Sequence, residues 1–128
     1  GVYNTYAAGS VCAVDRVIVG GGSTGTATNW GYEDEMQYFP VASAADGLDF
    51  GDLVENNKHI GGTSDGTRGE FYGGQNPSGE VFLNRIQKVT IGTLGNASDI
   101  GDLTFTGVTA TSGTEAGGGK EASAQSGT

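Results

Sequence analysis

An internal repeat constrains the fold of this chain more than any other feature of its sequence. Residues 36–53 (MQYFPVASAADGLDFGDL) and 86–103 (IQKVTIGTLGNASDIGDL) align without gaps at an offset of 50 positions. Five of the 18 aligned pairs are identical, whereas chance would give about one. The identical pairs are Gln37/Gln87, Asp49/Asp99, Gly51/Gly101, Asp52/Asp102 and Leu53/Leu103. Self-similarity at a fixed period is the sequence signature of repeat architectures.

A second landmark precedes each of these stretches. Residues 16–22 (RVIVGGG) and 68–74 (RGEFYGG) each contain an arginine, a run that favours β-structure and a glycine cluster, at an offset of 52. A third copy is expected to begin near residue 111 (TSGTEAGGG) and to be incomplete. We predict one domain over residues 1–128, divided at approximate boundaries into repeat 1 (14–65), repeat 2 (66–110) and a partial third repeat or tail (111–128).

The residues between these landmarks favour strands over helices. Glycine accounts for 25 of 128 residues, and each interior glycine costs a helix about 1 kcal/mol relative to alanine. Val, Ile, Thr, Phe and Tyr recur between the glycines and suit a pleated surface. We therefore predict an all-β fold in which each unit forms four short strands. Pro40 has no N–H group to donate, so its strand is expected at a sheet edge or at a bulge.

The expected strands can be placed most clearly in the second unit. They are residues 69–72, one or two strands within 81–91, and residues 103–107 after a turn at 96–99. The first unit follows the same plan with a longer, acidic and aromatic loop at 23–35.

The charge balance narrows the classes of partner. The chain has 6 Lys and Arg residues against 15 Asp and Glu residues, a formal net charge of −9. Phosphate backbones and anionic lipids repel such a chain, which argues against nucleic-acid partners. Apolar runs are far shorter than the roughly 18 residues that suggest a transmembrane helix, so no membrane insertion is expected. The chain begins at Gly1, so we expect either a processed leader or a piece of a longer protein.

Residues 67–74 and 86–104 carry a resemblance to a known repeat. Repeats of about 50 residues with a strand that ends in Gly-Gly are typical of kelch propeller blades, although the tryptophan that usually follows is missing from both units. The two segments more closely resemble the kelch-like repeat of structural (tail or fibre-type) proteins of marine bacteriophages. In that repeat, T-R-G-x-F-G-G-G alternates with I-x-x-V-T-I-x-T-x-G-N-A-x-D-F-G-D-L-T. With more drift, the resemblance covers residues 14–119, and it implies kelch-like β-propeller blades in a virion or extracellular protein.

Two units are too few to close a propeller. A single blade cannot cover both of its faces, and propeller rings usually hold four to eight blades. We therefore expect the ring to be completed by oligomerisation or by a longer chain. Three copies with two blades each would give a six-bladed ring, so a homotrimer is one expected arrangement, with other virion proteins as further partners.

One segment is expected to bind a ligand or a partner. It contains Trp30, Tyr32, Glu33, Asp34 and Glu35, and it differs most from its counterpart in the other unit. Aromatic rings beside carboxylates suit protein interfaces and also sugar recognition. Packing against a neighbouring chain is the favoured interpretation, and packing within the blade and contact with a host surface glycan are the alternatives.

A second group of residues is expected to be structural, because its members recur in both units. The structural repeat positions are Arg16, Gly21, Gly22, Arg68, Gly73, Gly74, Asp49, Gly51, Asp52, Asp99, Gly101 and Asp102. The triplet Asp46, Asp49 and Asp52 raises the alternative of a Ca²⁺ site, but a spacing of three does not match a Ca²⁺ loop. An Asp beside Gly commonly bonds its own backbone in a turn. We therefore predict turn formation and no metal.

Catalysis is not favoured by any motif. His59 is the only histidine, and it lies in a polar stretch, residues 55–62, that indicates a solvated turn. The glycine cluster at 20–22 lacks the Lys-Ser/Thr of a phosphate-binding loop. A glycosidase that uses an acid within residues 33–35 is the remaining enzymatic alternative.

The sequence therefore predicts a non-enzymatic protein without a cofactor. Its expected role is structural, in assembly or adhesion, as a tail, fibre or decoration protein of a phage virion. The alternative is a lectin-like module that binds surface polysaccharide.

Overall fold

The described part of the molecule is built from β-strands. The computed structural model describes residues 8–26, 29–76 and 82–104, and every regular element within these ranges is a strand. The strands are β1 (Gly9–Cys12), β2 (Arg16–Gly20), β3 (Ser23–Thr26), β4 (Asn29–Tyr32), β5 (Glu35–Pro40), β6 (Leu48–Asp52), β7 (Gly61–Ser64), β8 (Arg68–Tyr72), β9 (Arg85–Thr90) and β10 (Ser98–Asp102). The all-β prediction is confirmed for these residues. They include no helix that could cross a membrane.

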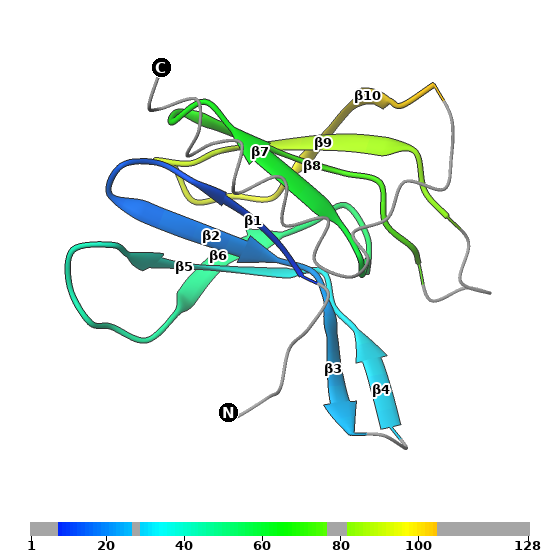
Figure 1. The fold of residues 1–128 in the computed structure, drawn as a ribbon, viewed down its shortest axis with the longest axis horizontal. Coiled ribbons are helices and arrows are strands. Elements are labelled where there is room, and N and C mark those ends of the chain that lie inside the picture. Colours follow the sequence, from blue (N-terminus) through cyan, green and yellow to red (C-terminus); the bar gives the residue numbers. More distant parts are fainter. Residues whose placement is uncertain (1–7, 27–28, 77–81, 105–128) are drawn as a thin grey trace.

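The strands form two four-stranded antiparallel sheets and one hairpin (Figure 1). The first sheet has the order β1-β2-β5-β6 and the second the order β10-β9-β8-β7, so each is a meander. The hairpin β3-β4 is inserted between β2 and β5. Each of the two sheets has four strands, which is the number predicted for each unit. The predicted loop at 23–35 is wrong, because most of this segment pairs with itself as the hairpin.

The two sheets are equivalent strand by strand. β1 and β2 lie 52 positions before β7 and β8, and β5 and β6 lie 50 positions before β9 and β10. The pairing shares one register: Val11 pairs with Ile18 in the first sheet. Thr63 pairs with Glu70 at the same place in the second sheet. Both sheets also carry a β-bulge between their last two strands. The offsets of the sequence repeat therefore recur in the pairing of the strands.

The two sheets bury opposite faces against each other. Successive side chains of a strand point to opposite faces of its sheet. Because the two sheets share one register, equivalent residues lie on corresponding faces of their own sheets. Ile18 is buried in the first sheet, whereas its equivalent Glu70 lies on the outer face of the second. Phe71 is buried in the second sheet, whereas its equivalent Val19 lies on the outer face of the first. The two sheets therefore contribute opposite faces to their contact, which is a head-to-tail arrangement. In a contact about a twofold axis, both sheets would use the same face.

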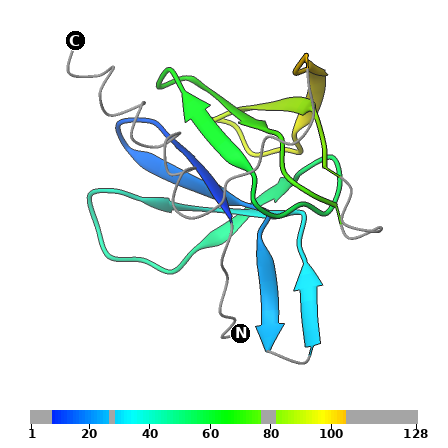
Figure 2. The same cartoon turned by 45° about the vertical axis from the view of Figure 1, so that its right-hand side comes forward.

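Glycines allow β1 to lie directly against the second sheet. β1 runs beside β7 (Figures 1 and 2). A Cβ atom on Gly62 would lie 2.4 Å from the carbonyl oxygen of Ser10, and one on Gly69 would lie 2.5 Å from Cγ2 of Val11. These distances are shorter than atoms tolerate, so a larger residue at either glycine would push the sheets apart.

One hydrophobic core lies between the sheets. It contains side chains from both sheets and from the segment at 53–60 that joins them. The buried members are Val11, Ile18, Met36, Phe50, Leu53, Ile60, Phe71, Val89 and Ile91. Tyr38 packs against this core, and its ring meets the ring of Phe50 edge-on with centroids 5.9 Å apart. Burial of one such side chain contributes about 1.5–3 kcal/mol, so each sheet depends on the other for its stability.

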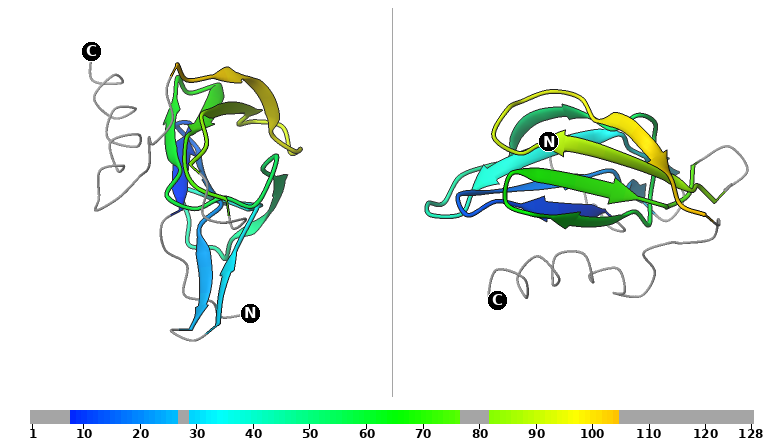
Figure 3. Two further views of the ribbon diagram at one scale, coloured as in Figure 1. Left: turned by 90° about the vertical axis from the view of Figure 1, so that its right-hand side faces the viewer. Right: turned by 90° about the horizontal axis from the view of Figure 1, so that it is seen from above.

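The loop at 91–97 also binds the free edge of β6. The N–H of Gly95 donates to the carbonyl of Phe50 at 2.9 Å, and the N–H of Ala97 donates to the carbonyl of Asp52 at 2.8 Å. The N–H of Asp52 donates in turn to Oδ1 of Asn96 at 3.0 Å. A segment of the second unit therefore pairs with the outer strand of the first (Figure 3).

Two predictions about strand positions are wrong in part. β5 lies between β2 and β6, so it is a central strand and not an edge strand. Pro40 is tolerated because it is the last residue of β5, and the bulge of this strand pair lies between Met36 and Gln37. Leu103 and Thr104, the described part of the strand predicted at 103–107, are not in a strand, and residues 105–107 lie outside the described ranges. β10 covers Ser98–Asp102 instead, so it includes part of the turn predicted at 96–99.

The change from one sheet to the other falls at residues 53–60. β7 consequently belongs to the second sheet, although the predicted boundary between the repeats was at residue 65. β1 belongs to the first sheet, although the predicted unit began at residue 14. The predicted third repeat at 111–128 lies outside the described residues.

Replacing Gly51 with alanine tests the stacking. Gly51 and Gly101 have φ angles of 142° and 156°, so an alanine is strained at both positions. A Cβ on Gly51 would lie 2.4 Å from the carbonyl oxygen of Gly95, whereas one on Gly101 would meet open space. We expect Gly51→Ala to lower the free energy of unfolding by about 1–3 kcal/mol more than Gly101→Ala. Urea denaturation at low protein concentration measures both losses, and equal losses would contradict the stacking.

Candidate functional site

The surface between the two sheets is the best-defined candidate site, and Arg16 is its first polar anchor. Arg16 opens β2, where it extends over the ring of Tyr38 with 4.6 Å between the guanidinium carbon and the ring centroid. Its Nη1 donates to the carbonyl of Ile91 at 3.2 Å. The arginine that opens this strand therefore binds the loop of the second unit.

Gln87 supplies a second polar anchor from the second sheet. Its side chain is fully buried on β9, and Oε1 accepts a hydrogen bond from the N–H of Val54 at 2.8 Å. Val54 belongs to the segment that leaves β6. Nε2 of Gln87 is buried and has no hydrogen-bond partner among the described residues. This contact fixes the path of the connecting segment across the second sheet.

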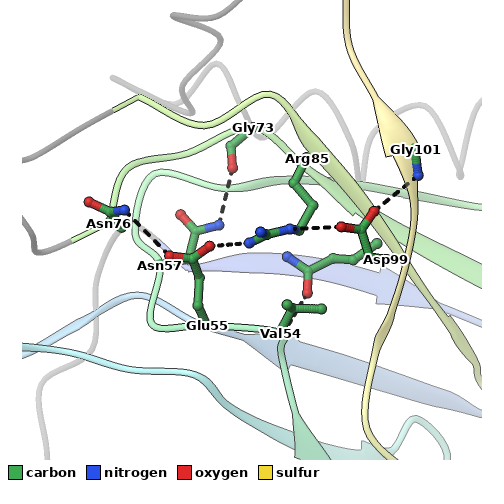
Figure 4. A network of polar contacts seen from close by, with 9 residues as sticks. Val54, Glu55, Asn57, Gly73, Asn76, Arg85, Asp99 and Gly101 are labelled. Atoms are coloured by element: carbon green, nitrogen blue, oxygen red, sulfur yellow. Dashed lines mark hydrogen bonds and ion pairs between the residues drawn. The ribbon is translucent and has the colours of Figure 1, made fainter.

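Asn57 joins the connecting segment to both units. Its N–H donates to the carbonyl of Glu33 at 3.0 Å, and its carbonyl accepts from the N–H of Gly22 at 2.8 Å. Its side-chain Nδ2 donates to the carbonyl of Gly73 at 3.1 Å (Figure 4). Asn57 is fully buried. Sequence analysis missed it because it lies in a polar stretch that indicates a surface turn, and only the stacked sheets enclose it.

Arg85 forms two ion pairs beside this junction. Its guanidinium binds Glu55 and also Asp99, whose Oδ2 lies 3.2 Å from Nε (Figure 4). The hydrogen bond with Glu55 is the main reason that the pKa of Arg85 is raised. Arg85 opens β9, so this pair attaches the connecting segment to the second sheet.

The acidic run at Glu33, Asp34 and Glu35 uses its backbone to fix the base of the hairpin. The carbonyl of Asp34 accepts from the N–H of Leu53 at 2.7 Å, and that of Glu35 accepts from the N–H of Gly21 at 3.1 Å. The N–H of Glu33 donates to the carbonyl of Gly22 at 3.0 Å. These three residues therefore connect the hairpin to the first sheet and to the segment that follows β6.

The hairpin itself points away from both sheets (Figures 1 and 2). Trp30 and Tyr32 lie on β4, where they pair with Gly25 and Ser23 of β3. Ser23 is fully buried, and its hydroxyl donates to the carbonyl of Gly31 at 3.0 Å. The structure describes only the main chain of Trp30 and Tyr32, so the predicted contacts of the two rings lie outside the described part.

The glycine clusters of the repeat motif surround Asn57. Gly21, Gly22, Gly73 and Gly74 have positive φ angles between 69° and 101°. A Cβ on Gly21 would lie 2.8 Å from the carbonyl oxygen of Asn57, and one on Gly74 would lie 2.0 Å from its Oδ1. The clusters therefore end β2 and β8 and leave room for the buried asparagine.

The repeated aspartates lie on or beside the outer strands β6 and β10. Asp49 and Asp52 belong to β6, and Asp99 and Asp102 belong to β10. Oδ1 of Asp99 accepts from the N–H of Gly101 at 3.2 Å, which is a turn-type contact within the bulge. Asp46 lies in the exposed loop before β6. The described residues hold no group of three His, Cys, Asp or Glu side chains that could bind a metal.

The predicted solvated turn at 55–62 is wrong in part. Asn57 and Ile60 are buried in it, and so are Gly61 and Gly62. His59 is half-buried with a φ angle of 56°, the one non-glycine residue in the described ranges with a positive φ. The segment is polar in composition but enclosed, because it runs between the two sheets.

The turn before Arg68 is fixed by Asp65. Oδ1 of Asp65 accepts from the N–H of Arg68 at 2.8 Å and from the N–H of Thr67 at 2.9 Å. The bond from Arg68 is the main reason that the pKa of Asp65 is lowered. The side chain of Arg68 is displayed on the surface at the start of β8.

A substitution at Ser64 tests the contact between β1 and β7. Oγ of Ser64 donates to the carbonyl of Cys12 at 2.9 Å and accepts from its N–H at 3.2 Å. Ser64→Ala leaves both groups of Cys12 without this partner, so we expect a loss of about 1–3 kcal/mol in the free energy of unfolding. The control, Ser98→Ala, changes an exposed serine and should stay within about 0.5 kcal/mol. Urea denaturation compares them, and equal stability of the two variants would contradict a structural role for this contact.

Comparison with known proteins adds no family to this geometry. No protein-family model and no curated protein sequence matches the chain.

Proposed function

We propose that this protein is a non-enzymatic structural component that works by assembly or adhesion. The observation that carries this proposal is the head-to-tail stacking of two equivalent four-stranded sheets. A contact between unlike faces can be repeated by further units, and it then generates rings or filaments. A protein of this kind acts through its shape and its surfaces.

Kelch-like propeller blades are the finer form of this proposal. Each sheet is a four-stranded antiparallel meander, as a propeller blade is. The first strands of the two sheets lie side by side, and the last strands lie at the outer edges. Three copies with two blades each would complete a six-bladed ring. The partners of the chain are then further copies of itself and other virion proteins.

The contacts of the polar residues support a structural role over catalysis. Asp99 bonds the bulge and Arg85, and Asn57 joins the sheets. The main chain of the acidic run at 33–35 holds the hairpin. These residues would serve the framework, and no reaction needs to be assigned to them. The proposed setting is a phage virion, in which the chain would be a tail, fibre or decoration protein. The resemblance of residues 67–74 and 86–104 to phage structural proteins supports this setting.

A lectin-like module that binds surface polysaccharide is the second candidate. The observation that favours it is the hairpin β3-β4, which projects away from both four-stranded sheets. Its second strand carries Trp30 and Tyr32, and aromatic rings can stack on sugars. On this proposal the hairpin is the adhesive element and the sheets are its support.

Light scattering of the purified chain tests the assembly proposal. We expect a particle mass of two or more times 12.9 kDa, the mass of one chain. The measurement uses moderate salt, because salt screens the repulsion between copies of an acidic chain. A folded monomer at every concentration would contradict assembly. Binding to a glycan array that is lost in Trp30→Ala and Tyr32→Ala, without a change in mass, would favour the lectin-like module instead.

A further inference from the structure

The residues that make the polar contacts between the two sheets have exposed equivalents on the outer surfaces of the described part of the molecule. Inside the chain, three groups of the first unit bind three groups of the second. Arg16 binds the carbonyl of Ile91, the N–H of Val54 binds Gln87, and the N–H of Asp52 binds Asn96. Every one of these six residues has an equivalent in the other unit, at the offset of 50 or 52 positions.

The equivalents of the first three residues lie on the outer side of the second unit. They are Arg68, Thr104 and Asp102, and all three are exposed. Asp102 belongs to β10, which is the outermost strand of the second sheet. β10 and β6 share one register, so the N–H and carbonyl groups of Asp102 point to the outer edge of β10, as those of Asp52 point to the outer edge of β6.

The equivalents of the other three residues lie on the outer side of the first unit. They are Val41, Gln37 and Asp46, and all three are exposed. Gln37 repeats Gln87 without change, and Asp46 keeps the side-chain oxygen with which Asn96 accepts its hydrogen bond. The loop at 41–47 has the same length as the loop at 91–97 that binds β6. The outer sides of one molecule therefore carry exposed equivalents of both sets of residues that form its internal contact.

The exposed apolar residues follow the same pattern. Val41 is 57 % exposed and Ile100 is 45 % exposed, whereas their equivalents Ile91 and Phe50 are 1 % and 2 % exposed. Ile91 and Phe50 belong to the core between the sheets. Val41 and Ile100 would therefore be covered if the internal contact were repeated between molecules.

The second sheet also offers room for an incoming loop. An open hollow of about 300 Å³ lies beside Arg68, lined by Thr63, Ser64, Asp65, Arg68 and Glu70. In the first sheet the equivalent arginine, Arg16, receives the carbonyl of Ile91. Because Asp65 fixes the turn before Arg68, the side chain of Arg68 starts from a defined place.

We propose that a second copy of this chain docks on the outer side of the second sheet through its loop at 41–47. Arg68 binds the carbonyl of Val41, and the edge of β10 at Ile100 and Asp102 binds Ala45, Asp46 and Gly47. The docking repeats the contact of Gly95, Asn96 and Ala97 with β6. This inference rests on the proposed function and names the partner surfaces of the assembly.

The contact between copies is weaker than the contact within the chain. On the outer face of the second sheet, Glu70 and Lys88 pair at the positions that Ile18 and Tyr38 occupy in the first. Charged side chains at these positions bury less apolar surface than the isoleucine and the tyrosine do. The copies therefore associate reversibly, and their contact is heterologous, since each contributes a different surface.

Cross-linking of mixed single-cysteine variants tests this docking. The background is Cys12→Ser, which removes the only native cysteine. One variant carries Ala45→Cys and the other Ile100→Cys. The equivalents of these residues, Gly95 and Phe50, share a hydrogen bond of 2.9 Å, so a short bismaleimide can join the two thiols. Leu94→Cys replaces Ala45→Cys in the control mixture, because Leu94 lies in the loop that already binds β6 of its own chain.

We expect covalent dimers when the Ala45→Cys and Ile100→Cys variants are refolded together. Covalent dimers should form neither with either variant alone nor in the control mixture. Cross-linking of a single variant with itself would show a contact between like surfaces and would overturn the docking. Assembly in light scattering without the mixed cross-link would overturn the docking and leave the proposed function intact. A monomer at every concentration would overturn both.

Discussion

The close approach of two equivalent sheets is the constraint on which the rest of the structure depends. Because Gly62 and Gly69 have no side chains, the main chain of β1 and the side chain of Val11 can lie against the second sheet. The core forms between the two inner faces, and the segment at 53–60 is enclosed there although its composition is polar. Neither sheet could bury its apolar face alone, since a single layer of strands leaves both faces in water.

The direction of the stacking connects this packing to function. A twofold contact would use the same face of both sheets and would leave one dimer with nothing further to bind. Here the sheets use opposite faces, so the two ends of one molecule carry two different surfaces. Arg68 and the edge of β10 lie at one end, and the loop at 41–47 lies at the other. Such an arrangement allows further units to add in series, because the two ends of a molecule are different surfaces.

The sequence predicted the repeat well because its identical pairs lie where both units need the same geometry. Gly51 and Gly101 occupy the bulge, and Arg16 and Arg68 open matching strands. Strand order was less predictable, because Pro40 indicates an edge strand and nothing local shows that β5 ends at this residue. The buried roles of Asn57 and Gln87 could not be predicted either. Polar residues in such patterns usually face water, and only the contact between units that lie far apart in the sequence encloses them.

Hydrogen exchange of single amides, followed by NMR, measures the stacking most directly. In dilute solution the amides of Gly95 and Ala97 are bonded to β6 and should exchange slowly. The amides of Ala45 and Gly47, their equivalents on the outer loop, should exchange fast and become protected as the protein concentration rises. Equally fast exchange of all four amides at every concentration would contradict the account, because the second unit would then not be held against the first.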